Sequence, residues 1–556
     1  MSTTTDCKWN PSIARIAMLA VTAFVFMNSA ELQAAAQTSV TTYHYDNYRT
    51  GWNQKESVLT PSNVASPSFG LLHQVQLDDQ VDAQPLVVPG VAIAGGTHDV
   101  VYVVTEKNTV YAIDVHTGMP LVSVNLGTAV PLPLGCNNNA NNVGITSTPV
   151  IDPSSNTMYV VAYTLENNSQ VYRLHALDLG TLTDKLPSAV VSAQHTLTNG
   201  TVFSFNAQYQ RQRPALLLAN GGIYVGFGSF CDFSANLSRG WLLGWTAATL
   251  TPFPSSQLND QQATDSGNFF LSSIWMSGYG PATDDSGNIL FVTGNSDART
   301  YDGITNLQES VVKISNTLTA VIDLFTPRNQ VSLDNADADF GSGGVMVLPD
   351  QPGSTPHLAV AAGKNGTMFL LNEDNLGHYS PKKNNVLASY SIGGCWCGES
   401  YYMDPKDGLG RVVSSGGSTV EVWKVETKIK PALKKAASSA FIGGGQDPGF
   451  FTSISSNGST NPIIWALSRP SGSGNNISLF AFDPETGGST LKQLFQASAG
   501  TWPYLGGNAN LVPVVANGQV FVASYKQLSI FGLTNGVTNG LSSVTKPKAT
   551  KAANQQ

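Results

Sequence analysis

Short stretches of alternating apolar and polar residues recur along the chain from about residue 80 onward. The clearest copy has apolar segments at 85–88, 99–105 and 109–114, separated by turns rich in Gly, Asn and Asp. This alternation is typical of β-strands bounded by turns, and no stretch of useful length has the 3.6-residue period of a helix. The pattern therefore predicts an all-β protein.

The same unit returns at a nearly constant spacing. The prolines that open the first four copies, Pro85, Pro149, Pro214 and Pro281, are 64, 65 and 67 residues apart, and later copies begin near residues 344, 400, 451 and 512. A fixed period with about four strands per unit is the signature of a β-propeller. We count eight units and predict eight blades. The sixth unit is the least regular, so a seven-bladed propeller is the alternative.

The last unit is one strand short, with apolar segments only at 512–515, 519–524 and 528–533. The upstream segment 69–77 has the pattern of the missing outer strand, and its pairing with the last unit would close the ring and remove open sheet edges. The predicted organisation is a signal peptide at 1–36, an N-terminal extension at 37–65, the propeller at 66–533 and a disordered tail at 534–556.

The first 36 residues have the features of a targeting segment. Lys8 and Arg15 precede an apolar run at 16–27, and small residues follow up to Ala36. This is the order of a secretory signal peptide, and the run is shorter than the ~20 residues that span a bilayer. We expect a periplasmic or secreted protein without a membrane span after cleavage.

The cysteines agree with an oxidising compartment. Of five cysteines, Cys7 lies in the predicted signal peptide, and the other four allow three pairing schemes. We favour a Cys136–Cys231 disulfide, with Cys395 and Cys397 left as neighbours. The Cys395-Trp396-Cys397 sequence does not predict a zinc site, because a second pair of ligands is missing.

Composition excludes several classes of function. The net charge is −8, and charged residues make up 12% of the chain, against roughly 25% in an average domain. The basic patch that a nucleic-acid partner requires is absent. Hydrophobic residues make up 42%, enough for a large core. Neither the H-E-x-x-H motif of zinc proteases nor the G-x-S-x-G motif of serine hydrolases occurs.

Several motifs resemble those of quinoprotein propellers. Segments 112–118 and 481–487 are similar to the A-x-D-x-x-T-G motif that closes their blades. Between residues 272 and 375, Trp275, the Thr-Gly-Asn sequence ending at Asn295, Asp337-Ala-Asp339 and Lys364 follow the order found in quinoprotein alcohol dehydrogenases. The whole chain also resembles exported bacterial propellers with this repeat, with the segment 45–51 near its start.

This resemblance implies pyrroloquinoline quinone (PQQ) and Ca²⁺ as cofactors. It implies that Trp275 stacks under the quinone, that Asn295 and Asp339 ligate calcium, and that Lys364 contacts the quinone carbonyls. It also implies that Asp339, or Asp337 two residues earlier, is the catalytic base. The chemistry is consistent, because oxygen ligands suit Ca²⁺, a carboxylate can remove an alcohol proton, and a cation can polarise a quinone.

The sequence departs from the family at two places. The family has a vicinal Cys-Cys pair where this chain has the single Cys136, and it has a glutamate calcium ligand where this chain offers Asp232. We assign Asp232 to the predicted metal site on that basis.

The segments that enter the innermost strands of a propeller lie at one mouth of its channel. Here they carry polar groups interleaved with tryptophan, which suit a carbohydrate, a polyol or the quinone, and they add Arg213 and Trp396 to the predicted cofactor-binding residues. The predicted function is PQQ- and Ca²⁺-dependent oxidation of an alcohol or sugar. A non-catalytic binding or scaffolding propeller and a carbohydrate-active hydrolase or lyase are the alternatives. The predicted rim consists of Gln84, Thr146, Gln212, Arg213, Trp275, Ser277, Asp339, Ser342, Trp396, Gln446, Asp447, Trp502 and Asn508.

Overall fold

The computed structural model describes residues 1–2, 37–132, 134, 140–230, 237–262, 271–444, 446–470, 475–485, 487–504 and 507–534. The chain divides into two units between Ala36 and Gln37, and the second unit is considered in its described residues, 37–534 with the gaps given above. The predicted signal peptide, the Cys136–Cys231 pair, Asp232 and residues 535–556 lie outside the described residues.

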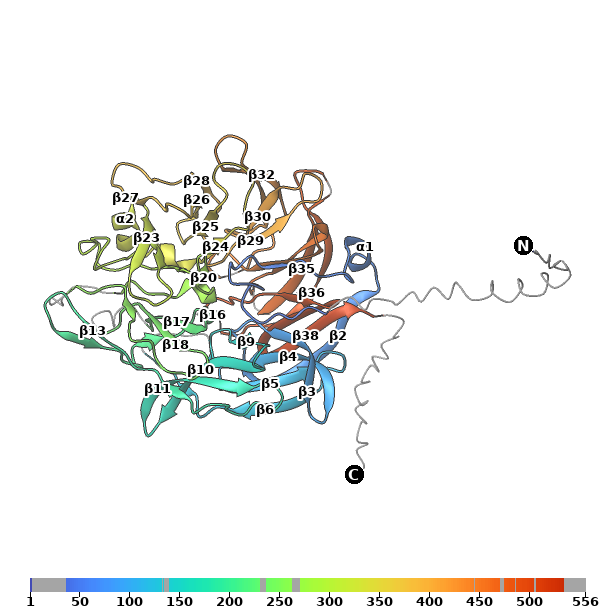
Figure 1. The fold of residues 1–556 in the computed structure, drawn as a ribbon, viewed down its shortest axis with the longest axis horizontal. Coiled ribbons are helices and arrows are strands. Elements are labelled where there is room, and N and C mark those ends of the chain that lie inside the picture. The colour runs from blue at the N-terminus through green and yellow to red at the C-terminus, as the bar shows by residue number, and fades with distance from the viewer. Residues whose placement is uncertain are drawn as a thin grey trace, which may run out of the picture. The chain divides into compact units, whose positions relative to one another are not determined.

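The second unit is an eight-bladed β-propeller, with blades arranged in chain order around a central axis (Figure 1). The prediction of eight blades is confirmed, and the seven-bladed alternative is wrong. From the innermost strand outward, blade one consists of β3 (Leu86–Ile93), β4 (Gly96–Val104), β5 (Thr109–Asp114) and β6 (Pro120–Asn125); blade two of β9 (Val150–Asp152), β10 (Thr157–Glu166), β11 (Ser169–Asp178) and β12 (Ala189–Val190); and blade three of β16 (Leu217–Ala219), β17 (Gly222–Ser229), β18 (Trp241–Thr246) and β19 (Gln257–Leu258). Blade four consists of β20 (Ala282–Thr283), β21 (Ile289–Val292), β22 (Val311–Ile314) and β23 (Val321–Thr326); blade five of β24 (Val345–Val347), β25 (Leu358–Ala362), β26 (Thr367–Asn372) and β28 (Ala388–Ser391); and blade six of β29 (Ser400–Met403), β30 (Gly410–Ser414), β31 (Glu421–Glu426) and β32 (Ala432–Ser438). Blade seven consists of β33 (Thr452–Asn457), β34 (Thr460–Leu467), β35 (Asn476–Asp483) and β36 (Lys492–Thr501), and blade eight of β37 (Val514–Ala516), β38 (Gln519–Leu533) and β2 (Phe69–Gln80).

Short elements join the blades or add to their edges. Among the described residues, no helix has the length and apolar character needed to cross a membrane. The short elements are β1 (Trp52–Asn53), β7 (Val130–Pro131), β8 (Asn142–Val143), β13 (Gln194–Thr196), β14 (Val202–Ser204), β15 (Gln210–Arg211), β27 (His378–Tyr379), the helices α1 (Pro61–Val64) and α2 (Gln330–Asn335), and the 3₁₀ turns η2 (Met276–Gly278) and η3 (Phe340–Ser342).

The ring closes between β2, which precedes the first blade in sequence, and β38, and these two strands lie side by side in Figure 1. β2 pairs antiparallel with β38, with Phe69 opposite Leu533 and Gln76 opposite Gln527. The Phe69 ring packs against Trp465 and Phe495 of blade seven, with centroid distances of 5.8 and 4.8 Å. The predicted completion of the last blade by the segment 69–77 is confirmed.

The core lies between successive blades, because the inner strands bury both faces. Residues 289–292 of β21 are all fully buried, which explains why inner strands are continuous apolar runs. The Asp114 carboxylate accepts hydrogen bonds from the backbone N–H groups of His116 and Thr117 and from the Thr117 hydroxyl. The A-x-D-x-x-T-G motif thus shapes the turn that leaves the third strand.

Residues 40–53 fill the channel and hydrogen-bond to the innermost strand, or the residue just before it, in every blade. Arg49, which is fully buried, donates to the carbonyl oxygens of Leu216 and Pro281 from two different blades. The segment 45–51 that marks the resemblance to exported propellers therefore has a packing role in this chain. The other contacts join Val40 to Val87, Thr41 to Ile151, Asn47 to Thr283, Tyr48 to Val347, Thr50 to Tyr401, Gly51 to Ile454 and Asn53 to Val515.

Candidate functional site

Loops at one mouth of the channel bring most of the predicted site residues together. Trp275 precedes η2 at the entry to blade four, and Asn295 follows β21 of the same blade. Asp339 precedes η3 at the entry to blade five, and Lys364 follows β25. These positions are far apart in sequence and meet because each lies at the same end of its blade.

Trp275, Asp339 and Lys364 form the centre of the cluster. The Trp275 Nε1–H donates to Asp339 Oδ2 at 3.0 Å, and the Lys364 Nζ lies 3.4 Å from the same oxygen. Lys364 Nζ is also 5.4 Å from the Trp275 ring centroid. A Cβ on Gly294 would lie 3.2 Å from Trp275 Nε1 and 3.3 Å from Asp339 Oδ2. The glycine of the Thr-Gly-Asn sequence therefore permits this close approach.

Asp337 and Asn295 lie beside this centre. Asn295 Nδ2 donates to Asp337 Oδ1 at 3.2 Å, and Lys364 Nζ donates to the same oxygen at 3.2 Å. Asp337 is exposed, whereas Asp339 is only 4% exposed. Lys364 thus contacts both candidate bases, and Asp339 is the one shielded from water.

The pKa of Asp339 is raised by burial, and the Lys364 ammonium opposes that rise. Glu309 lies close by, and burial together with the negative charges of Asp339 and Asp334 raises its pKa well above the usual range. Its Oε2 accepts from the Phe340 N–H at 2.5 Å. Glu309 Oε1 and Asp339 Oδ1 are buried without a hydrogen-bond partner among the described residues.

Glu309 was not predicted from the sequence. It stands directly before Ser310 and the apolar strand β22, and its complete burial emerges only in the folded structure. An unpaired carboxyl at such a position is costly and points to a bound cation or a shared proton.

The residues fit the two implied cofactors to different degrees. Trp275 offers an aromatic surface, and the guanidinium carbon of Arg213 lies 5.5 Å from its ring centroid. With Lys364 on the same indole, two cations lie where they would attract a negatively charged ligand such as the quinone. The orphan oxygens of Asp339 and Glu309 are suitable calcium donors. Within the described ranges, however, no three acidic, His or Cys side chains bring their ligand atoms together at this place. The fit to calcium is therefore incomplete.

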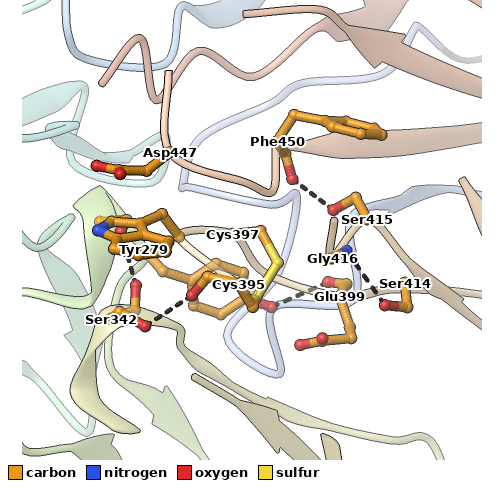
Figure 2. The surroundings of a disulfide bond; sticks show 12 residues. Tyr279, Ser342, Cys395, Cys397, Glu399, Ser414, Ser415, Gly416, Asp447 and Phe450 are labelled. Atoms are coloured by element: carbon orange, nitrogen blue, oxygen red, sulfur yellow. Dashed lines mark hydrogen bonds between the residues drawn. A yellow bond between two sulfur atoms is a disulfide. The ribbon is translucent and has the colours of Figure 1, made fainter. Parts of the chain in front are cut away.

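Trp396 lies between Cys395 and Cys397, whose side chains and surroundings are drawn in Figure 2. Cys395 and Cys397 are joined by a disulfide across Trp396. Lys364 Nζ lies 5.7 Å from the Trp396 ring centroid, so the ammonium contacts both Trp275 and Trp396. Arg469, also not predicted, donates to the Trp396 carbonyl at 2.5 Å and to Asn510 Oδ1 at 2.8 Å.

A second group of charges lines the side of the mouth near blades one to three. Burial and Asp82 raise the pKa of Glu106 well above its usual range, and Glu106 accepts from the Gly144 N–H at 2.7 Å. Burial and the neighbouring Arg211 lower the pKa of Arg213 to about 9. Cations thus gather at the mouth of an acidic protein, where they would favour an anionic ligand.

Two features lie away from this cluster. Trp502, predicted at the rim, is fully buried, because its indole packs in the core between blades seven and eight. Its indole therefore offers no exposed surface to a ligand. A groove of about 720 Å³, lined in part by Pro352, Leu409 and residues 426–430, contains none of the predicted site residues.

Comparison with known proteins supports the architecture. No protein-family profile matches the chain, and no curated protein sequence matches it. Its fold is similar to that of the quinohemoprotein alcohol dehydrogenase ADHIIG from Pseudomonas putida HK5, at 13% identity, covering 93% of this chain and 82% of that one, with a TM-score of 0.56. It is also similar to a europium-containing methanol dehydrogenase, at 12% identity, covering 89% and 98%, with a TM-score of 0.56. The chain therefore has a quinoprotein-type propeller fold.

Proposed function

We propose that the channel mouth is a PQQ-dependent site that oxidises an alcohol or a sugar in an exported protein. The observation that carries this proposal is the Trp275–Asp339–Lys364 cluster, which places an aromatic surface, a shielded carboxylate and a cation within direct contact. The names of the two similar structures, an alcohol and a methanol dehydrogenase, support it. The Cys395–Cys397 disulfide and the N-terminal segment support export.

The chain's own residues would bind the quinone, orient the substrate beside it and remove the hydroxyl proton. The Trp275 ring would hold the quinone, with Lys364 and Arg213 as the cations facing its oxygens. The quinone itself supplies the redox chemistry. Asp339 Oδ2 is engaged by Trp275 and Lys364, so Oδ1, which lacks a partner among the described residues, would take the hydroxyl proton.

Asp339 must be ionised to act as this base. Burial raises its pKa, whereas the Lys364 ammonium and the Trp275 N–H lower it. A calcium ion held by Asn295, Asp339 and Glu309 would lower the pKa of both carboxyls further, because it would neutralise their mutual repulsion. The unpaired Oε1 of Glu309 is the reason to include Glu309 in this ligand set.

Reconstitution tests the proposal. The purified protein would be mixed with micromolar PQQ and millimolar Ca²⁺, and its absorbance, melting temperature and dye-linked alcohol oxidation would be measured. A ligand at a hundredfold excess over its Kd stabilises a fold by roughly 2.7 kcal/mol. Asp339→Asn should abolish oxidation and keep most of the stabilisation, whereas Asp337→Asn should keep both if Asp339 is the base. Absence of any spectral change and of any stabilisation would overturn the proposal.

A non-catalytic binding propeller is the second candidate. The observation that favours it is the incomplete calcium site beside a mouth rich in cations, which would hold an anionic small molecule without turnover. This candidate would be favoured if the quinone stabilised the fold without Ca²⁺ and if no alcohol or sugar reduced the dye.

A further inference from the structure

The disulfide at the mouth has an acid beside it. Cys395, Cys397 and Glu399 are spaced two residues apart along a segment that bends at Trp396 and Cys397, and this bend brings the Cα atoms of the two cysteines to 4.8 Å. One carboxylate oxygen of Glu399 and both sulfurs lie within 4.8 Å of one another, and all three residues are buried. Figure 2 shows the carboxyl beside this loop.

Among the described residues, no charged side chain pairs with the buried Glu399 carboxyl. Its Oε1 is buried and accepts no hydrogen bond from the described residues. The Tyr279 hydroxyl donates to the backbone carbonyls of Glu399 and Arg49 instead of the carboxylate. A hydrogen bond from the backbone N–H of Glu399 itself favours the ionised carboxylate, but burial outweighs it. The Arg49 guanidinium is used by backbone carbonyls, and the His44 ring packs against Tyr279. A purely structural disulfide does not require such an acid, so the carboxyl needs another explanation.

The disulfide loop also contacts neighbouring segments at the channel mouth. The Cys395 carbonyl accepts from the Ser342 hydroxyl at 2.6 Å, and the Trp396 N–H donates to the Pro448 carbonyl at 3.2 Å. A Cβ on Gly449 would lie 3.1 Å from the Cys397 Cβ. Residues 448 and 449 therefore pack directly against the disulfide loop, and their displacement would change access to it.

We propose that Cys395–Cys397 is a thiol–disulfide exchange site in which Glu399 gives a proton to the leaving thiolate, and that its reduction by an external dithiol releases Trp396 from the channel mouth. The inference goes beyond the proposed oxidation and does not depend on it.

The exchange transfers two electrons from the dithiol to the disulfide. A thiolate of the dithiol attacks one cysteine sulfur, the Cys395–Cys397 bond breaks, and the other sulfur leaves with the electron pair and takes the Glu399 proton. The second thiol of the reductant passes its proton to the Glu399 carboxylate and attacks the mixed disulfide. The second cysteine leaves as a thiolate and takes this proton from Glu399, and solvent returns to Glu399 the proton that the first thiol released when it ionised. The protein gains two electrons and two protons, and the dithiol becomes a cyclic disulfide. Burial raises the pKa of Glu399 to about 7, so the acid carries its proton in weakly acidic solution.

The test measures reduction of this bond under native conditions. The full-length protein would be incubated with dithiothreitol between about pH 5.5 and 8.5, free thiols would be alkylated, and the peptide containing residues 395–397 would be quantified by mass spectrometry. The rate, divided by the concentration of dithiol thiolate, should fall as the pH rises through about 7, because Glu399 then loses its proton. In Glu399→Gln this dependence should disappear, and the rate near pH 6 should drop about tenfold or more.

Glu373→Gln is the matched control. Glu373 is also a buried glutamate whose pKa burial raises to about 7, but it pairs with Lys313 of blade four, away from the disulfide. This variant should keep the wild-type profile, and Glu399→Asp should restore part of it. Hydrogen exchange of the peptide covering residues 394–398 should rise on reduction.

Two outcomes would overturn the proposal. One is a bond that resists the dithiol until the protein is denatured. The other is a wild-type protein whose normalised rate is the same on both sides of pH 7, a result that needs no variant to fold. Neither measurement uses the quinone, so failure here and failure of the proposed oxidation are separate results.

Discussion

The indole Nε1–H of Trp275 donates a 3.0 Å hydrogen bond to Oδ2 of Asp339, across 64 residues of sequence. The bond joins the entry of blade four to the entry of blade five. It also makes the aromatic surface and the candidate base one unit, because a shift of the indole changes the environment of the carboxylate. Substitutions at Trp275 and Lys364 should separate the effect of the aromatic surface from the effect of charge on Asp339.

Trp275→Phe removes the hydrogen bond and keeps an aromatic surface. The bond lowers the pKa of Asp339, so its loss should raise that pKa. Since the base must be ionised, the acid limb of the pH profile of dye-linked oxidation should move to higher pH, while the quinone still stabilises the fold. Trp275→Ala should lose the stabilisation as well. An unchanged acid limb in Trp275→Phe would contradict Asp339 as the base.

Lys364→Met removes the ammonium that contacts both indoles. We expect a rate loss of about 100-fold or more, the usual effect of removing one electrostatic stabiliser, together with a higher pKa of Asp339. Lys364→Arg keeps the charge and the contact with the rings and should retain more activity. Equal losses in both variants would mean that the shape of the side chain, and not its charge, matters here.

Closure of the ring should depend on Phe69. This side chain is 4% exposed and packs on two aromatic rings, so Phe69→Ala should cost about 3–5 kcal/mol of unfolding free energy. Leu71→Ala on the same strand is the control, because Leu71 is 40% exposed and its loss should cost little. Denaturant unfolding measures both. Deletion of residues 66–78 should expose the edge of β38 and cause aggregation, whereas a variant that melts like the full protein would contradict closure through β2.

The sequence was sufficient for the fold because the repeat is local. Each blade carries its own strands and turns, so the period alone indicates eight units, and the unpaired last unit identifies Phe69–Leu77 as its partner. The channel filling by residues 40–53 could not be predicted, since those contacts reach eight separate strands and leave no local pattern.

The same distinction applies to the candidate site. Trp275, Asp339 and Lys364 could be named because their order resembles that of known quinoproteins. Glu309 and Arg469 could not, because the features that single them out are burial and a missing or distant partner, which only the folded arrangement creates. The pairing of Cys395 with Cys397 was likewise left open by the number of cysteines.

The pH dependence of stability should reflect several buried carboxyls. Burial raises the pKa of Glu399, Glu373 and Asp334 to about 7. A carboxyl with a raised pKa binds more protons folded than unfolded, so its contribution to stability is full below the unfolded pKa and is lost as the pH rises through about 7. Buried His44, whose pKa is lowered to about 3, acts in the opposite direction below about pH 6.5, so stability should decrease between about pH 6.5 and 7.5. Glu166 and Asp407, whose partners lower their pKa to about 2, act only at lower pH and do not offset this loss.

Glu399→Gln isolates one of these contributions. The rise of its pKa from 4.5 to about 7 corresponds to about 3 kcal/mol lost by the wild type above neutral pH, and glutamine cannot ionise. The difference in unfolding free energy between variant and wild type should therefore shift in favour of the variant by that amount between about pH 5 and 8, measured from urea midpoints at each pH. A difference that stays constant with pH would mean that the carboxyl has a normal pKa in the folded protein. In that case Glu399 would carry no proton near neutral pH, and the disulfide beside it would lack its acid.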